Sequence, residues 1–180
     1  FDLSAVEVVT MPVEQLKEYL DSNSIYYVSV EHSLAYTAKE IAERVNIKGD
    51  QMAKTVMINL DGCISMVVLP ASCRIRWDRF MEAMGTELVS LATEDEFKDR
   101  FPSCEVGAMP PFGDLYEIPT YMYEGFDEDG EIAFRAGSHH EVIKMKFEDY
   151  LSLAKPMTLT EGFAKVGVKR PEWMKRKKSA

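Results

Sequence analysis

The feature that most constrains the fold is a pair of apolar runs separated by only two residues. Met52–Leu60 and Cys63–Leu69 are each long enough for a strand, and Asp61-Gly62 lies between them. Asp-Gly between two such runs is a strong signal for a β-hairpin, because both residues tolerate the positive φ angles of a tight turn. The sequence therefore predicts a long antiparallel hairpin, with Pro70 closing its second strand.

Short helices and further strands surround this hairpin in the sequence. Thr37 with Glu40, and Thr93 with Glu96, form capping boxes that predict helix starts, and Gly85 is typical of a helix end. The predicted helices cover about 11–20, 38–45, 78–84, 94–101 and 148–154, and the further strands about 25–30, 88–91, 119–123, 131–135 and 141–145. The expected fold class is α+β, a single compact domain with a central mixed or antiparallel sheet and flanking helices.

The predicted domain spans residues 25–155, preceded by a helical extension (1–24) and followed by a basic tail (156–180) that looks like an appendage. No run approaches the ~20 consecutive apolar residues that a membrane helix needs, and the first residues do not form a signal peptide. The three cysteines include no Cys-x-x-Cys pair, which favours free thiols. We therefore expect a cytoplasmic protein without a membrane partner.

Charge is unevenly distributed along the chain. The formal net charge is −9, but residues 169–180 carry +5, which leaves −14 for residues 1–168. Such an acidic body argues against broad nonspecific nucleic-acid binding, and we expect no DNA partner. The basic tail either anchors a polyanion or is a solvated terminus, and the sequence leaves both interpretations open.

Lys54 is the most unusual residue of the first hairpin strand. Alternation places it on the same face as Val56 and Ile58, although lysine is rarely buried without a partner. One interpretation is an edge-strand lysine that prevents aggregation. The other is a cation directed into a pocket, where it would stabilise a phosphate, a carboxylate or a developing oxyanion.

Two turn-rich segments follow, and both suggest a small site. The loop from Gly107 to Gly113 contains Pro110-Pro111-Phe112, and its mixture of glycine and proline makes it stiff enough to present backbone N–H groups to an anion. It could equally be a rigid connector. The second segment, Gly137-Ser138-His139-His140, is predicted to be a turn between two strands.

Metal, cofactor and covalent chemistry are not expected at these segments. His32 is the only other histidine, and adjacent histidines on a strand point to opposite faces, so a three-histidine metal site is not expected. Ser138 next to His139 invites a catalytic-triad interpretation, but no Gly-x-Ser-x-Gly nucleophile motif occurs. We expect neither a metal nor a cofactor.

In this order and spacing, the segments resemble the YbaK/prolyl-tRNA-synthetase-associated domain family of aminoacyl-tRNA deacylases. The resemblance runs from about Ile25 to Leu153. It is carried by Val30-Glu31-His32, the Thr37–Val45 helix, Ala53-Lys54-Thr55, Val67-Val68-Leu69-Pro70, the Gly107–Gly113 loop, and Gly137-Ser138-His139 before Val142-Ile143-x-Met145. It implies a compact α+β fold that uses no metal or cofactor.

The resemblance also implies site residues. Lys54 matches the key lysine of the family, and the backbone N–H groups of Gly107 and Gly113 would help it to stabilise the oxyanion. Substrate-binding positions would be His32, Pro110, Pro111, Phe112, Gly137, Ser138 and His139, with His139 preferred to His140 as the histidine that faces the pocket.

The expected function is a free-standing, metal-independent deacylase that hydrolyses the ester of mischarged tRNA, with a small amino acid on tRNA for proline as the expected substrate. Its partners would be the 3′ end of aminoacyl-tRNA and a synthetase or other tRNA-binding protein. Two alternatives stay open: a non-catalytic module that binds an aminoacyl or other small ligand, and a metal- or thiol-dependent hydrolase of small esters or amides.

Overall fold

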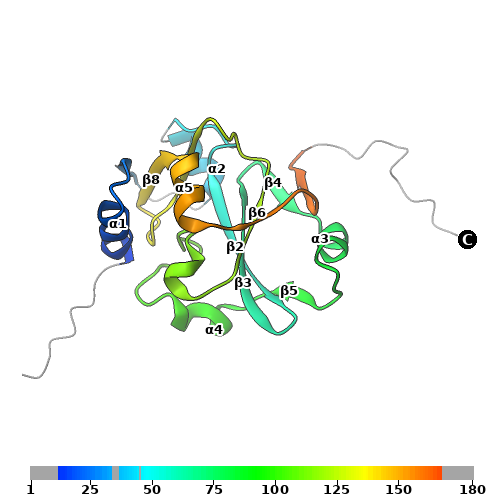
Figure 1. Cartoon of the computed structure of the whole chain (residues 1–180). Coiled ribbons are helices and arrows are strands. Elements are labelled where there is room, and N and C mark those ends of the chain that lie inside the picture. The colour runs from blue at the N-terminus through cyan, green and yellow to red at the C-terminus, as the bar shows by residue number, and fades with distance from the viewer. Residues whose placement is uncertain (1–11, 34–36, 45, 168–180) are drawn as a thin grey trace, which may run out of the picture.

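The computed structural model describes residues 12–33, 37–44 and 46–167, which form helices around two β-sheets and a separate strand pair (Figure 1). The helices are α1 (Pro12–Ser22), α2 (Ala38–Arg44), α3 (Trp77–Met84), α4 (Glu94–Phe97) and α5 (Phe147–Ala154), with 3-10 turns at Lys98–Arg100 and Gly113–Tyr116. The strands are β1 (Tyr27–Glu31), β2 (Ala53–Leu60), β3 (Cys63–Pro70), β4 (Cys73–Ile75), β5 (Val89–Leu91), β6 (Thr120–Tyr123), β7 (Glu131–Arg135), β8 (Glu141–Lys146), β9 (Met157–Leu159) and β10 (Phe163–Lys165).

The hairpin of β2 and β3 is the centre of the larger sheet, as predicted. Its register runs from Ala53 opposite Pro70 to Leu60 opposite Cys63. Asp61 and Gly62 have φ angles of 52° and 83°, the conformation that Asp-Gly turns favour. The strand order is β5-β2-β3-β6-β9, and β6 and β9 pair in parallel. The predicted α+β fold with a mixed sheet is therefore confirmed.

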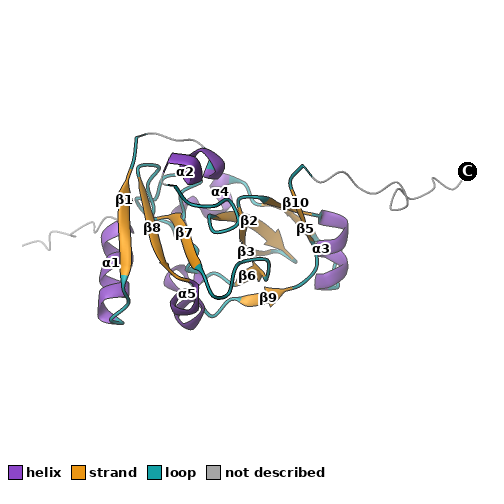
Figure 2. Ribbon diagram, turned by 90° about the horizontal axis from the view of Figure 1, so that it is seen from above, coloured by secondary structure: helices purple, strands orange, loops and turns teal. Residues whose placement is uncertain are grey.

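The second sheet has the order β1-β8-β7 and is antiparallel throughout. It lies beside α1, at the opposite end of the molecule from α3 (Figure 2). A parallel bridge between Met52 and Ala133 joins β7 to the start of β2, and β2 next pairs with β5 only from Ile58 onward. Between these two points, the edge of β2 meets a loop in place of a strand.

Local capping signals are where the sequence predicts them. The Thr37 N–H donates to Glu40 Oε2 at 3.0 Å, and the Glu40 N–H donates back to Thr37 Oγ1 at 3.1 Å. Thr93 and Glu96 form the same reciprocal pair, and Gly85 ends α3 with a φ of 66°. These confirmed caps fix where α2, α3 and α4 begin or end.

The ends of the described chain belong to the folded body. Leu16 and Leu20 of α1 are fully buried in the main core, so α1 packs as part of the domain. The expectation that the chain after Pro156 is an appendage is wrong for residues 157–165, because β9 pairs with β6 and β10 pairs with β4. Most of the predicted basic tail, residues 168–180, lies outside the described residues, as do residues 1–11 of the predicted extension.

None of the described helices has both the length and the apolar character needed to cross a lipid bilayer.

Candidate functional site

The loop that replaces a strand beside β2 brings the three predicted segments together. Gly137 N–H donates to the Ala108 carbonyl at 2.8 Å, and Glu105 N–H donates to the Gly137 carbonyl at 2.9 Å. On the opposite side, Thr55 Oγ1 donates to the Met109 carbonyl at 3.1 Å. The loop of residues 105–109 is thus held between the end of β7 and the middle of β2.

A small cavity of about 40 Å³ lies at this junction. Residues 52–55 of β2, Gly107, Met109 and Arg135 line it. The volume has room for a few waters at most, because the centre of one water needs roughly 10–15 Å³. The cavity therefore suits the reacting centre of a substrate, and the rest of the substrate has to lie outside it.

Lys54 supplies a cation to this cavity. Its side chain is half-buried, and this burial lowers the pKa of its ammonium group, while the nearby Cys73 thiol has the opposite, weaker effect. Among the described residues, no carboxylate forms an ion pair with it. The loop of residues 105–109 covers the edge of β2 next to Lys54, so this edge is not open for an edge-protecting lysine to shield, and a charged group with a perturbed pKa in a cavity is typical of functional sites.

Arg135 is a site residue that the sequence reasoning missed. It ends β7, and its Nη1 donates to the Gly107 carbonyl at 3.1 Å. Burial lowers the pKa of its guanidinium, and the carboxylates of Glu105 and Glu40 raise it. The available signal was an arginine at the end of an apolar strand, immediately before the Ala136-Gly137 turn.

His139 holds the other side of the same loop. Its backbone N–H donates to Glu105 Oε2 at 2.5 Å, and its Nε2 lies 2.9 Å from the Val106 carbonyl. A carbonyl can only accept, so Nε2 carries the proton in the neutral ring and Nδ1 is left as an acceptor. Nδ1 is buried and has no partner among the described residues, whereas His140 is exposed. An alanine at Gly107 would place its Cβ 3.6 Å from His139 Cε1, so the ring packs directly over the loop.

Two other predicted residues have local roles next to this site. Ser138 Oγ accepts the His140 N–H at 2.9 Å, which fixes the turn. The His32 N–H donates to the His140 carbonyl at 2.8 Å, and His32 Nδ1 lies 2.8 Å from the Ser33 carbonyl. Neither side chain lines the Lys54 cavity, and contact of either with a substrate stays a prediction.

The structure does not bring the second half of the predicted loop to the cavity. Phe112 is 1% exposed, and its ring centroid lies 5.3 Å from that of Tyr150 and 5.4 Å from that of Phe134. Pro110 and Pro111 are also buried, and the Pro111 carbonyl accepts the Tyr150 hydroxyl at 2.9 Å. Gly113 is buried at the start of a 3-10 turn. These contacts are those of a core segment, which supports the rigid-connector interpretation for residues 110–113.

Burial makes two of the three thiols poor nucleophiles. It raises the pKa of Cys104 to about 12, and it also raises the pKa of Cys73. Cys63 is exposed but lies beside the Asp61-Gly62 turn, at the far end of β2 from Lys54. Within residues 12–33, 37–44 and 46–167, no three His, Cys, Asp or Glu side chains are grouped so that they could hold a metal ion.

Comparison with known protein families shows the family to which this chain belongs. The sequence pattern of the aminoacyl-tRNA editing domain matches residues 32–153. The chain belongs to the aminoacyl-tRNA editing domain family. At the level of the family, this membership supports an aminoacyl-tRNA deacylase and agrees with the resemblance seen in the sequence.

Solved structures confirm the fold of this editing domain. One similar structure is a scaffold protein used for epitope backbone grafting by computational design, with a TM-score of 0.73 and 17% identity over 89% of this chain and 100% of that chain. Another is a protein whose assignment as a trans-editing enzyme for prolyl tRNA synthetase is itself provisional, with a TM-score of 0.71 and 17% identity over 86% of this chain and 98% of that chain. A search of curated proteins gave no match.

Proposed function

We propose that this editing domain protein is a free-standing deacylase that hydrolyses the ester of mischarged aminoacyl-tRNA, with a small amino acid on tRNA for proline as its substrate. The observation that carries the proposal is the half-buried Lys54 ammonium, without a carboxylate partner among the described residues, in a cavity closed by the Gly107 loop. The similarity to a provisionally assigned prolyl trans-editing enzyme supports the choice of tRNA.

The chemistry needs little more than a positioned cation. An aminoacyl ester is already activated, and attack by water on its carbonyl places negative charge on the carbonyl oxygen. A fixed cation in a partly dehydrated cavity stabilises that charge more than it stabilises the neutral ester, which lowers the barrier. In this proposal Lys54 meets the developing oxyanion, and the ribose hydroxyl of the tRNA is the leaving group.

The Gly107 loop contributes through its position. Its Gly107 N–H now points to Met109 Sδ at 3.3 Å, and a thioether is a weak acceptor that a stronger anion can replace. Arg135 and His139 hold the loop from two sides through the Gly107 and Val106 carbonyls. We assign Arg135 and His139 as positioning residues, and Lys54 as the catalytic residue.

The mechanism is proposed to be metal-independent, since Lys54 supplies the charge stabilisation that a Lewis acid would otherwise provide. The test of the whole proposal is deacylation of alanyl- and cysteinyl-tRNA for proline by the full chain, with and without a chelator. We expect turnover that the chelator does not change. Loss of turnover with the chelator would contradict metal independence, and no turnover on a panel of mischarged tRNAs would favour the non-catalytic binding module.

Lys54→Met is the decisive variant, because it keeps the length of the side chain and removes the charge. We expect kcat to fall by about 10²–10³-fold, the usual effect of removing one oxyanion-stabilising group. Lys144→Met is the matched control, since Lys144 is also half-buried but pairs with Glu131 at 3.4 Å on the other sheet. Near-full activity of Lys54→Met would refute the assignment.

A further inference from the structure

Two cations share the small Lys54 cavity. Lys54 reaches it from β2 and Arg135 from the end of β7, and among the described residues that line it these are the two that carry a charge. The carboxylates of Glu105 and Glu40 act on Arg135 electrostatically, but neither residue lines the cavity. The lining is therefore positive, and a group that enters it is stabilised most if that group is an anion.

Both cations are also partly removed from water. Each side chain is half-buried, and burial is the main cause that lowers the pKa of Lys54 and of Arg135. A charge that has lost part of its hydration gains more from an opposite charge than a fully hydrated one does, because the surroundings screen the pair less. An anion in this cavity is therefore held more strongly than it would be beside two exposed side chains.

The donors at the cavity suit a carboxylate. Arg135 Nη1 donates to the Gly107 carbonyl at 3.1 Å, and the planar guanidinium has five N–H donors, whose fork matches the two oxygens of a carboxylate. The Gly107 N–H is directed at Met109 Sδ, a weak acceptor that an anion can replace. The volume of about 40 Å³ holds about three water centres, which is roughly the space of one carboxylate group.

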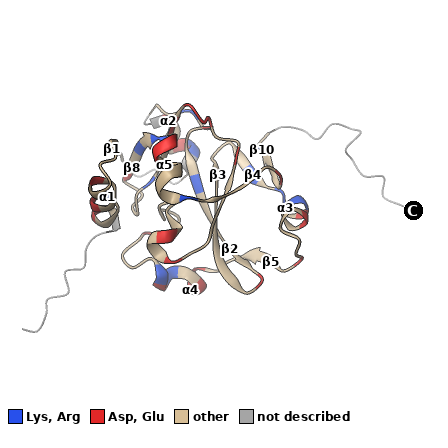
Figure 3. Cartoon of the chain, in the orientation of Figure 1, with Lys and Arg blue, Asp and Glu red and all other residues tan. Residues whose placement is uncertain are grey.

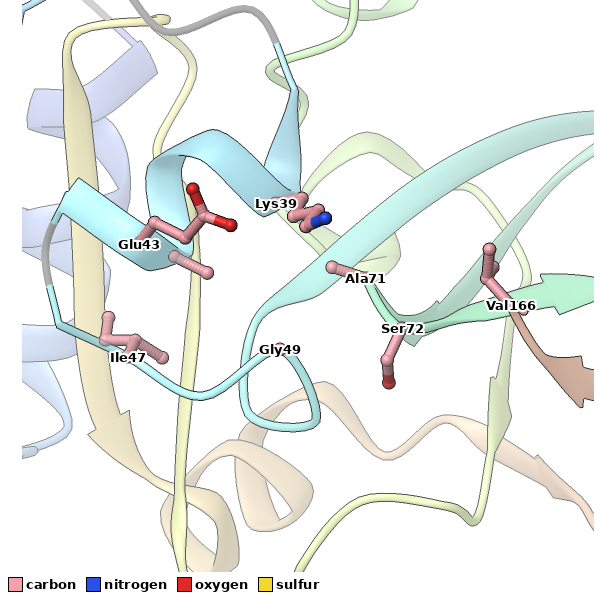
Figure 4. Close-up of a pocket in the computed structure, with 8 residues that line it drawn as sticks. Lys39, Glu43, Ile47, Gly49, Ala71, Ser72 and Val166 are labelled. Atoms are coloured by element: carbon pink, nitrogen blue, oxygen red, sulfur yellow. The ribbon is translucent and has the colours of Figure 1, made fainter. Parts of the chain in front are cut away.

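A larger cavity nearby does not offer the same charges. It has a volume of about 340 Å³ and lies between α2 and the turn that joins β3 to β4 (Figure 4). Lys39 and Glu43 line it with one charge of each sign, so their effects on a small anion partly cancel. The Lys54 cavity, lined by two charges of the same sign, is the better site for a small anion.

We propose that the Lys54 cavity is a carboxylate site, in which Lys54 and Arg135 together bind the acid that hydrolysis releases and also bind small free carboxylates, which thereby inhibit the enzyme. The inference rests on the proposed function for the origin of the bound acid. In that reaction water adds to the ester carbonyl, the bond from the carbonyl carbon to the ribose oxygen breaks, the ribose oxygen takes a proton, and the new acid releases one. A neutral ester thus becomes an anion beside two cations, so the product is held more tightly than the acyl group of the substrate.

The first experiment measures the binding of sodium propionate to the full chain by NMR, with the backbone amide signal of Gly107 as the readout and the ionic strength held constant. Propionamide is the matched ligand, because it has the same size without the charge. We expect propionate to bind at least about tenfold more tightly than propionamide, since hydrogen bonds between charged groups are about twice as strong as neutral ones. Equal affinities, or no binding of propionate, would overturn the inference.

Variants of Arg135 test whether its charge binds the carboxylate. Arg135→Gln removes the charge but keeps an amide that can donate to the Gly107 carbonyl, and we expect it to raise the Kd of propionate at least about fivefold. Arg135→Lys restores the charge without the planar fork and should recover part of this affinity. Arg76→Gln is the matched control, because the Arg76 side chain is 19% exposed but pairs with Asp78 at 3.2 Å. If Arg135→Lys binds propionate as weakly as Arg135→Gln, the charge is not what binds, and the contact is refuted.

The third measurement separates this inference from the proposed function. Propionate should inhibit deacylation of alanyl-tRNA competitively, and Arg135→Gln should raise the Ki of propionate by a larger factor than the KM of the ester, because the ester carbonyl is neutral. Equal factors would mean that Arg135 acts only by positioning the loop, and would overturn the inference. Deacylation that propionate does not inhibit would also overturn it and leave the proposed function standing. Binding of propionate that depends on Arg135, without any deacylation, would refute the proposed function and leave the cavity as a carboxylate site.

Discussion

Gly113→Ala is the substitution whose effect the structure defines most sharply. A Cβ at residue 113 would lie 2.0 Å from Thr120 Oγ1 and 2.2 Å from the Ile118 carbonyl oxygen, whereas real Cβ contacts essentially never fall below 3.0 Å. Thr120 could rotate away, but the Ile118 oxygen belongs to the backbone and must move. The Ile118 N–H also donates to the Gly113 carbonyl at 2.9 Å, so this movement strains or breaks a hydrogen bond.

The expected cost follows from these two effects. Overpacking of a buried site costs about 1–3 kcal/mol, and an unsatisfied buried hydrogen-bonding group costs about 1–3 kcal/mol more. Together they predict a loss of about 2–6 kcal/mol, a large part of the ~5–15 kcal/mol that stabilises a typical domain. Thr120→Ala in the same chain should restore part of this loss, because it removes one of the two clashes.

Urea denaturation with linear extrapolation measures the free energy of unfolding for each variant. Gly49→Ala is the matched control: its Cβ would lie 3.7 Å from Ser72 Cβ, an ordinary contact, and we expect a change within about 0.5 kcal/mol. A Gly113→Ala protein as stable as wild type would refute the packing argument. If that stable protein had also lost activity, Gly113 would belong to the catalytic site, as the sequence analysis expected.

Three further predictions concern a charge, a hydrogen bond and the C-terminal segment. Burial lowers the pKa of Lys54 below its ordinary 10.5, so between the folded pKa and 10.5 the unfolded chain binds more protons than the folded one, and wild-type stability should rise with pH through this window. Lys54→Met should lack this rise when urea denaturation is repeated across the window. Identical pH profiles for the two proteins would contradict the prediction. Tyr150→Phe removes the donor to the buried Pro111 carbonyl and should lower the free energy of unfolding by about 1–3 kcal/mol, while unchanged stability would show that this hydrogen bond contributes nothing. Deleting residues 169–180 should weaken binding of tRNA and flatten the slope of log K against log salt by up to about 0.9 for each phosphate that this segment neutralises; an equal slope would make the segment a bystander.

The C-terminal deletion is informative because residues 169–180 carry a net charge of +5, whereas residues 1–168 carry −14. Figure 3 shows acidic residues on α1 and both signs of charge on α3, while α4 is acidic and the 3-10 turn Lys98–Arg100 after it is mostly basic. The six lysines and arginines of residues 169–180 are therefore the best candidates for contacts with phosphates. If the salt slope is unchanged by the deletion, the phosphate contacts have to come from scattered cations of the body.

Local chemistry made much of the fold predictable. Asp61-Gly62 and the Thr37–Glu40 capping box each act within a few residues, so the sequence alone predicts the turn and the helix start. Lys54 was recognisable for a similar reason, as a charge on an apolar strand face. The same reasoning failed for β9, because the three residues Met157–Leu159 form a strand only when β6 is there to pair with them.

The candidate site was harder to predict than the fold, for a related reason. Phe112 and Gly107 are five residues apart in one loop, yet Phe112 lies in the aromatic core and Gly107 lines the Lys54 cavity. A turn-rich sequence does not reveal which of its residues are buried in the core. Arg135 became a site residue only because the Gly107 carbonyl lies within its reach, which no local pattern reports.

The pairing of β10 with β4 has a consequence for the order in which the protein is made. Phe163 lies opposite Ile75, so β4 has to wait for a strand that is synthesised 88 residues later. At the usual rate of ~5–20 residues per second, this interval is about 4–18 s. During that time the backbone groups of residues 73–75 lack the strand partner that they have in the folded protein. A ribosome that stalls within this interval would therefore leave this segment unpaired on the nascent chain, and we expect chaperones to engage it there.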